Sequence, residues 1–242
     1  MTTPAAVHLH ILYARRATKA VILRRGPARH VRCILWDWSD DTFEDGQWFR
    51  GRIRPEHSDI SADGRHFLYL AYDYGPGGAS VGHAWTAISR PPWLTALALY
   101  PDASYRGGGG RFLDDRRYLV DTTRDNQDLI RRAEGLERVF EAPRTETNTL
   151  GIAHEDGRRV NFRPEDLEHL SATTPNRPGP ENIRVEGGKL FRWFAKPDGS
   201  LDRSELIRDF TEMRFETLRA PYDWRDEAPD DLDWHPLGEE RS

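Results

Sequence analysis

The chain has 242 residues and a formal net charge of −5, with 37% hydrophobic and 31% charged residues. Its eight Trp, eight Tyr and ten Phe exclude a disordered chain, because disordered chains lack the aromatic residues that build a core. The length allows one large β domain or two small ones. The mild negative charge argues against a dedicated nucleic-acid-binding protein.

The first elements are predicted as consecutive strands. Residues 7–14 alternate between apolar and polar positions, as a strand with one buried face does. Residues 19–26 and 30–38 follow as short runs rich in β-branched and aromatic residues, with Gly26-Pro27 as a turn between them. We therefore expect the chain to begin with a series of antiparallel strands.

Further turn-and-strand units follow along the chain, at residues 59–74, 111–122, 149–162 and 188–210. Between them, the near-helical spacing of apolar residues over 124–140 predicts a short helix. Residues 163–171 suit one helical turn that Pro164 begins. The apolar spacing over 206–213 fits a helix as well as a strand, and residues 213–224 could form a final strand.

The dipeptide Asp-Gly recurs in the sequence and predicts tight turns, since glycine adopts a positive φ without a Cβ penalty. It begins at Asp45, Asp63, Asp156 and Asp198, and Asp114-Asp115 takes its place in a fifth unit. The spacing between these units is irregular. A propeller blade of four strands needs a repeat of about 40 residues, so this chain could hold about five.

Two segments resemble a known family. SADGRHFLYLAY, residues 61–72, is similar to the turn-and-strand element of WD40 and TolB-like propellers, and CILWD, residues 33–37, to their strand ending in Trp-Asp. Residues 20–122 also resemble conserved hypothetical bacterial proteins without an assigned activity. The resemblance implies a mainly all-β fold, a small β-propeller of about five blades with a few short helices. The alternatives are a β-sandwich and an α+β fold.

We expect one β-rich domain over residues 1–227 and an acidic tail over residues 228–242. Residues 1–36 contain seven Arg or Lys and no acid, whereas residues 223–242 contain eight acids and two basic residues. This asymmetry has two interpretations. The basic segment could bind an acidic partner, or it could attract the acidic C-terminal segment of its own chain, which is the interpretation we favour.

Features of the N-terminal region predict the compartment. No basic segment precedes the first apolar run, so no signal peptide is expected, and no run approaches the roughly 18 apolar residues of a membrane span. The one cysteine, Cys33, cannot form a disulfide within the chain, which fits a reducing cytoplasm. We expect a cytoplasmic protein without a membrane partner, and Cys33 as a buried small hydrophobic residue.

Two motifs could bind small ligands. In RGGGGRF, residues 106–112, consecutive backbone N–H groups could hold an anion between Arg106 and Arg111, although the motif is not a P-loop. His8 and His10 share one face of a predicted strand and could chelate a metal, with His83, His154, His169 or His235 as partners. The simpler interpretations are a wide loop and ordinary strand alternation, so we expect no metal and no cofactor.

The best single patch for binding is SVGHAWTAISRPPWL, residues 80–94, where His83, Trp85, Arg90 and Trp93 lie close in sequence. Trp and Arg are enriched in binding hot spots. With no coherent catalytic set in view, the sequence favours a non-catalytic module that binds a protein partner, and nucleic acid is not expected.

Two other functions stay open. A hydrolase of a glycan or a phosphate-containing substrate would need two or three acids in one pocket. The candidates are Asp37, Asp40, Asp41, Glu44, Asp59, Asp73, Asp114 and Asp115. Alternatively, the basic cluster over residues 15–32 would bind nucleic acid in a salt-dependent way.

Overall fold

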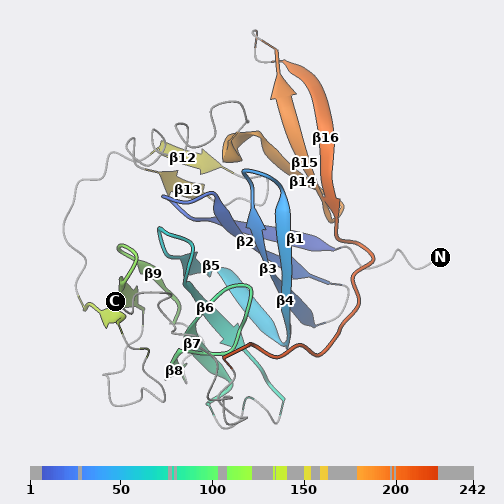
Figure 1. The fold of residues 1–242 in the computed structure, drawn as a ribbon. Coiled ribbons are helices and arrows are strands. Elements are labelled where there is room, and N and C mark those ends of the chain that lie inside the picture. Colours follow the sequence, from blue (N-terminus) through green and yellow to red (C-terminus); the bar gives the residue numbers. More distant parts are fainter. Residues whose placement is uncertain are drawn as a thin grey trace.

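The computed structural model consists mainly of β-strands, in five separate sheets that follow one another in chain order (Figure 1). The description covers residues 7–26, 29–75, 78, 81–102, 108–121, 133, 135–140, 150–153, 159–162, 179–196, 198 and 200–222. The mainly-β prediction is thereby confirmed. Each sheet is open, and their arrangement as five propeller blades stays a prediction.

The first two sheets are antiparallel meanders of four strands each. Sheet A contains β1 (His8–Tyr13), β2 (Lys19–Arg25), β3 (His30–Asp37) and β4 (Thr42–Arg50). Sheet B contains β5 (Arg52–Ile60), β6 (Phe67–Tyr72), β7 (Ala84–Ser89) and β8 (Ala98–Asp102). The single residue Gly51 joins the two sheets, so they lie against each other with almost no linker.

The remaining sheets are smaller. Sheet C contains β9 (Gly110–Phe112), β10 (Arg117–Val120) and β11 (Glu137–Arg138), with β11 parallel to β10; sheet D contains β12 (Leu150–Ala153) and β13 (Arg159–Phe162). After a 3₁₀ turn, η2 (Pro180–Asn182), sheet E contains β14 (Ile183–Glu186), β15 (Lys189–Ala195) and β16 (Leu201–Asp209). The turn η2 contacts both β12 and β15, which brings sheet D beside sheet E.

Sheet A is buried on both faces. Val21 and Leu23 pack against sheet B, while Ala20 and Ile22 point the other way and pack against sheet E. This explains why the run KAVIL is continuously apolar instead of alternating. Sheet B in turn packs its second face, including Leu68, against sheet C. The sheets therefore stack in the order E, A, B, C, with three apolar cores between them.

A buried ion pair fastens sheet E to sheet A. The guanidinium of Arg192 donates to both carboxylate oxygens of Asp41, at 2.7 and 3.0 Å, and to the carbonyl of Trp38 at 3.2 Å. Trp36 Nε1 also donates to Asp41. Such a two-pronged pair fixes geometry as well as charge, so the β3–β4 turn and β15 have one relative position.

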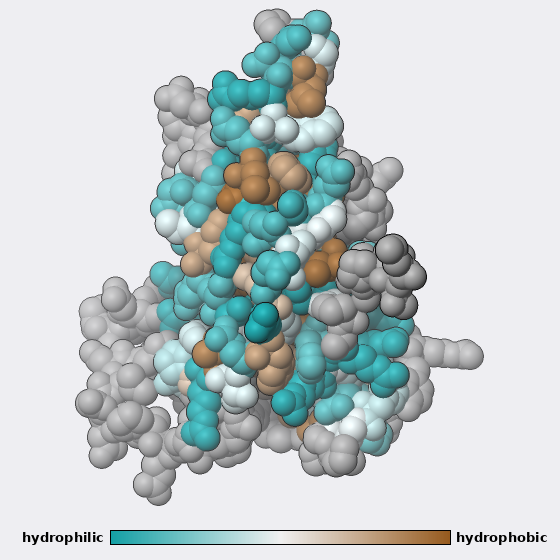
Figure 2. All heavy atoms as spheres, turned by 90° about the vertical axis from the view of Figure 1, so that its right-hand side faces the viewer, coloured by the Kyte–Doolittle hydropathy of each residue, from teal (hydrophilic) through white to brown (hydrophobic). Residues whose placement is uncertain are grey.

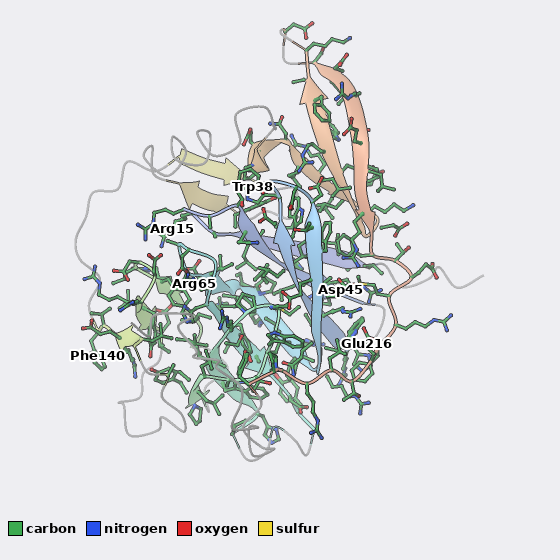
Figure 3. All side chains as sticks on the ribbon, viewed as in Figure 1. Arg15, Trp38, Asp45, Arg65, Phe140 and Glu216 are labelled. Atoms are coloured by element: carbon green, nitrogen blue, oxygen red, sulfur yellow. The ribbon has the colours of Figure 1, made fainter. Side chains whose placement is uncertain are left out.

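After β16, residues 210–222 form an extended C-terminal strap that crosses sheet A and reaches sheet B (Figure 1). At its start, Arg24 donates to the carbonyls of Phe210 and Thr211, at 3.1 and 3.2 Å. Arg32 then forms an ion pair with Glu216, which Figure 3 shows on the strap at the side of sheet A. Both arginines come from the basic N-terminal cluster, so part of that cluster binds its own chain. The acidic segment 223–242, which we expected as the partner of this cluster, lies outside the described residues.

The far end of the strap is fixed by Gln47 and Tyr222. Gln47 Nε2 donates to the carbonyl of Leu218 at 3.1 Å, and its Oε1 accepts from the backbone N–H groups of Leu94 and Thr95 at 2.6 and 3.0 Å. The hydroxyl of Tyr222 accepts from the N–H of Arg90 at 3.0 Å. One side chain of β4 therefore ties the strap to sheet B.

Three of the predicted turns fall between strands. The turn Asp63-Gly64 joins β5 to β6, with Gly64 at φ +77° as its type of turn requires. Asp114 lies in the β9–β10 turn and Asp198 in the β15–β16 turn, where each accepts nearby backbone N–H groups. Asp156-Gly157 lies outside the described residues.

One turn prediction is wrong. Asp45-Gly46 lies inside β4, where the register with β3 shifts between Arg32 and Ile34. The β3–β4 turn is instead made by residues 38–41, with Asp41 at φ +61°. At residue 46 a side chain would collide with Pro92, since a Cβ would lie 2.1 Å from its carbonyl oxygen. Gly46 is therefore needed for close packing at a β-bulge and not for a tight turn.

The structure also bears on the region that fitted a helix or a strand and on the two predicted helices. Residues 201–209 form β16, so the strand reading of this ambiguous region is right, and residues 213–220 of the expected final strand belong to the strap without regular pairing. Of the helix predicted over 124–140, the described part contains β11, and most of the rest lies outside the described residues, as do 163–171. The tail 228–242 also lies outside them.

We predict that Gln47→Leu releases the end of the strap. The substitution leaves the N–H groups of Leu94 and Thr95 and the carbonyl of Leu218 without partners, which should lower the free energy of unfolding by about 2 to 3 kcal/mol. Urea denaturation measures this loss. Trypsin should also cleave faster after Arg219, and an unchanged cleavage rate there would contradict a fixing role for Gln47.

Candidate functional site

A groove of about 410 Å³ lies where sheet A passes into sheet B. Its lining comes from the start of β3, the link between β4 and β5, and the end of β6 with the loop that follows: Arg29, His30, Arg50, Gly51, Arg52, Tyr72, Asp73, Tyr74 and Gly75. The groove therefore depends on the short connection between the two largest sheets.

Gly51 brings the chain close to β6 at the base of the groove. Its N–H donates to the carbonyl of Arg29 at 3.0 Å. A Cβ at this position would lie 2.4 Å from the carbonyl oxygen of Tyr72 and 2.4 Å from the ring of Phe49. Only a residue without a side chain allows this approach, so the close contact of the β4–β5 link with β6 depends on Gly51.

Three exposed arginines give the groove a positive charge. Arg29, Arg50 and Arg52 have no carboxylate partner among the described residues. The guanidinium of Arg50 lies over the ring of Phe215, 4.6 Å from its centroid, so the strap positions this cation from below. A cluster of like charges that form no ion pairs with acids among the described residues is a favourable place for an anionic group.

Aromatic rings form the opposite side. Tyr74 is 57% exposed, and its ring lies nearly parallel to those of Tyr72 and His83, with centroids 6.4 Å away in each case. His83 has φ +66°, and its Nδ1 contacts the carbonyl of Asp73 at 2.9 Å, which holds the loop end in place. The exposed ring of Tyr74, supported by the buried ring of Tyr72, can hold planar or apolar groups of a ligand.

One acid lies within the groove. The carboxylate of Asp73 accepts the backbone N–H of Gly75 at 2.8 Å, as aspartates in turns commonly do. Its N–H also donates to the carbonyl of His83 at 3.0 Å. Asp73 therefore has a structural role in shaping the loop, and the three arginines outnumber it in the groove lining.

The residues of the predicted patch do not form one site. His83 precedes β7 and Trp85 lies near its start, while Arg90 and Trp93 follow its end, so about 20 Å of strand separates the pairs. His83 stacks on Tyr74 at the groove, and Trp85 packs edge-on against Phe49 in the core between sheets A and B. The four residues are close in sequence, but β7 separates the first two from the last two.

Arg90 belongs to the strap contact, and Trp93 lies in the turn that follows it. The backbone of Arg90 is bound by the hydroxyl of Tyr222, and the N–H of Trp93 donates to the carbonyl of Arg90 at 2.9 Å. Burial lowers the pKa of Arg90 below its ordinary value. The backbone of Arg90 therefore holds the end of the strap against sheet B.

The predicted anion loop is described only from Gly108 onward. Arg106 lies outside the described residues, and Arg111 is an exposed residue of β9. Gly109 donates its N–H to Thr86 Oγ1 at 2.7 Å, and Gly108 to the carbonyl of Asp121 at 2.5 Å. These N–H groups are occupied within the protein, so they do not form a cradle for an anion.

The residues needed for a hydrolase do not converge around the most perturbed acid. Asp59 accepts the N–H of Phe112 at 2.7 Å. Burial raises the pKa of its carboxyl to about 6, against the lowering effects of that N–H and of Arg15 and Arg111. The neighbours that act on Asp59 are thus cations and N–H groups rather than a second carboxylate, so no acid–base pair is formed there.

Most of the basic cluster over residues 15–32 is used inside the protein. Arg16 pairs with Asp115 and Lys19 with Asp37, at 2.6 and 2.8 Å. Arg15 donates to the carbonyl of Phe112 at 3.0 Å; in Figure 3 it lies on the side of the molecule near sheet C. Arg29 differs from these three, because it lines the groove.

Cys33 is the buried residue that we predicted, and the described histidines belong to no cluster that could hold a metal. Cys33 is fully buried, and burial raises the pKa of its thiol far above the usual range, which keeps it unreactive. In the described part of the chain, no group of three or more His, Cys, Asp and Glu side chains could hold a metal ion. His154, His169 and His235 lie outside that part.

No helix among the described residues is long and apolar enough to cross a membrane.

Comparisons with models of protein families, with curated proteins and with solved structures found no match for this chain. The resemblance to WD40 and TolB-like propellers therefore stays a prediction. The groove, too, has to be judged on its own residues.

Our sequence interpretation missed most of the groove. Arg50, Arg52, Tyr72 and Tyr74 were not selected, although a signal was present. In WFRGR a glycine separates two arginines, and in YDYG two tyrosines flank an acid just before a glycine. Each pattern is common in strands and turns, and only the register of β5 with β6, which sets Arg52 opposite Tyr72, shows that they meet.

We predict that Gly51→Ala lowers the free energy of unfolding by about 1 to 3 kcal/mol. The added Cβ must push the link away from the carbonyl of Tyr72, which strains the junction of the two sheets. Arg50→Ala and Arg52→Ala, on either side, remove exposed side chains and should change stability by less than about 0.5 kcal/mol. Urea denaturation of the three variants tests this, and equal stabilities would contradict the close approach.

We predict that Asp59→Asn stabilises the protein at neutral pH. The pKa of Asp59 is raised to about 6 in the folded state from an ordinary 3.8, so folding favours its protonated form. Ionisation between about pH 4 and pH 6 therefore costs stability, which Asn avoids while still accepting the N–H of Phe112. Because Asp59 is partly exposed, we expect a gain of only about 1 to 2 kcal/mol at pH 7.5.

Urea denaturation at pH 4.5 and pH 7.5 measures this gain, which should be smaller at the lower pH. Asp209→Asn is a control of opposite sign, because hydrogen bonds from Thr211 lower the pKa of Asp209 to about 2. The carboxylate form of Asp209 is thus favoured by folding. A gain for Asp59→Asn that does not change with pH would contradict the proposed burial effect.

Proposed function

We propose that the chain is a non-catalytic binding module with a five-bladed, propeller-like arrangement, and that its groove holds a short acidic segment of a protein partner. The observation that carries the proposal is the set Arg29, Arg50 and Arg52, which lack carboxylate partners among the described residues and line the groove together with the exposed ring of Tyr74. Guanidinium groups bind carboxylates through paired, directional hydrogen bonds.

The order of the sheets supports the propeller-like part of the proposal. Sheets A and B are four-stranded meanders, as propeller blades are. Each first strand contacts the first strand of the next sheet, β1 with β5 and β5 with β9. The last described sheet, E, packs on the first, A, as the closure of a ring requires. A two-layer sandwich would not give three successive face-to-face cores.

Size and charge favour a short peptide as the ligand. A volume of about 410 Å³ suits a few residues rather than a long chain. The net charge of −5 would repel a long polyanion such as nucleic acid over the rest of the surface. A short acidic segment with an apolar or aromatic residue can pair with the arginines of the groove and pack against its tyrosines.

The test uses a fluorescein-labelled peptide of alternating Glu and Tyr, with a Gln-Tyr peptide as the uncharged control. We expect the Arg29→Gln, Arg50→Gln, Arg52→Gln triple variant to bind the acidic peptide at least about tenfold more weakly, since each pairing with a charged group contributes about 1 kcal/mol or more. Fluorescence anisotropy at 100 mM salt measures the affinities.

The matched control replaces Arg65, Arg116 and Arg214, three exposed arginines outside the groove lining, with Gln. It removes the same charge and should leave binding unchanged. Equal weakening in both triple variants would reduce the effect to net charge and overturn the proposal. A single-stranded oligonucleotide that binds the groove more tightly than the peptide would replace the protein partner by nucleic acid.

A further inference from the structure

The outer edge of sheet E stands apart from the groove and is open. β16 is the last strand of the order β14-β15-β16, and its second edge pairs with no strand among the described residues. Figure 1 shows the β15–β16 hairpin projecting beyond the other sheets, and Figure 2 shows this side with apolar side chains set among hydrophilic ones. An open strand edge is a template for pairing with another strand.

The exposed part of β16 keeps apolar residues on the surface. All six residues from Leu201 to Leu206 are exposed, and the two leucines at the ends are 46% and 54% exposed. This part contains no proline or lysine, two residues that commonly protect a sheet edge from pairing. Its charged residues, Asp202, Arg203 and Glu205, are of both signs, so they can pair with one another across an edge. Pairing with β15 is regular from Arg203 to Leu206, and the register shifts on either side of this stretch, at Asp202 and at Ile207.

We propose that β16 pairs antiparallel with β16 of a second copy of this chain, about a two-fold axis through Ser204. In this register Arg203 of each copy lies opposite Glu205 of the other, and Asp202 lies opposite Leu206. Directly opposed side chains of antiparallel strands are about 5 Å apart, so the two Arg–Glu pairs form across the interface. The same patch serves both copies, as a two-fold interface requires.

Charge excludes the neighbouring registers within the exposed segment. An axis through Arg203 would oppose arginine to arginine, and one through Glu205 would oppose glutamate to glutamate. An axis between two neighbouring residues is excluded by geometry, because it would set side chains from opposite faces of the two strands against each other. Like charges directly opposed destabilise a sheet, so the axis through Ser204 is selected.

The side chains of the pair are already positioned. Within one chain Arg203 Nε lies 3.0 Å from Glu205 Oε1, with both side chains more than half exposed, and the guanidinium of Arg203 lies 4.0 Å from the ring centroid of Phe194. The two charges therefore lie on one face of β16, ready to exchange partners. The short paired length gives an interface at the small end of the known range, so the dimer forms reversibly at micromolar concentrations.

Sedimentation of the full chain between about 5 and 500 μM tests the dimer. Arg203→Glu and Glu205→Arg should each weaken self-association at least about tenfold, because each opposes like charges. An equimolar mixture of the two variants should associate again, and so should the double variant that carries both changes. Arg54→Glu, which breaks an equally exposed ion pair with Glu56 on β5, is the matched control and should leave the dimer unchanged.

A cysteine at the axis tests the register. Ser204→Cys should give a covalent dimer on mild oxidation, since opposed Cα atoms of paired strands lie within disulfide range, whereas Asp202→Cys should not. The native Cys33 is buried and does not interfere. A monomer at every concentration, or a dimer that none of the charge variants weakens, would overturn the proposal without affecting the peptide-binding test.

Discussion

The structure depends on two arginines of sheet A that are buried with their charge. Arg24 and Arg32 are 1% and 6% exposed, and each lies over the ring of Trp48 at 5.4 Å. A buried cation is tolerated only when acceptors or an anion satisfy it. Here the strap supplies them, through the carbonyls of Phe210 and Thr211 and the carboxylate of Glu216. Sheet A, the first sheet, therefore needs the strap to satisfy its two buried arginines.

This constraint also shapes the groove. The strap brings Phe215 beneath Arg50 and beside His30, with ring centroids 4.7 Å apart in the second contact. Sheet A and sheet B meet across Gly51, and the strap lies along the same junction before it reaches sheet B. Packing from the C-terminal end of the chain therefore positions Arg50 and His30, although both come from the first third of the sequence.

Local chemistry made much of the fold predictable. Glycine with a positive φ at Gly64, and aspartates that accept nearby N–H groups at Asp114 and Asp198, act within a few residues, so the turns could be read from the sequence. Asp45-Gly46 has the same letters but a different cause, because its glycine makes room for Pro92, which lies 46 residues away. No local pattern distinguishes a glycine needed for φ from one needed for space.

In the candidate site, too, features set by neighbouring residues could be predicted, and features set by residues far apart in the chain could not. His83 was predicted as a binding residue and lies at the groove, stacked on Tyr74, but its expected neighbours Arg90 and Trp93 lie at the other end of β7. The sequence by itself determined the strands, most of their turns and the burial of the apolar runs, since these depend on neighbouring residues. Only the tertiary structure decided which arginines are buried, paired or free to bind, because that depends on strands and a strap far apart in the chain.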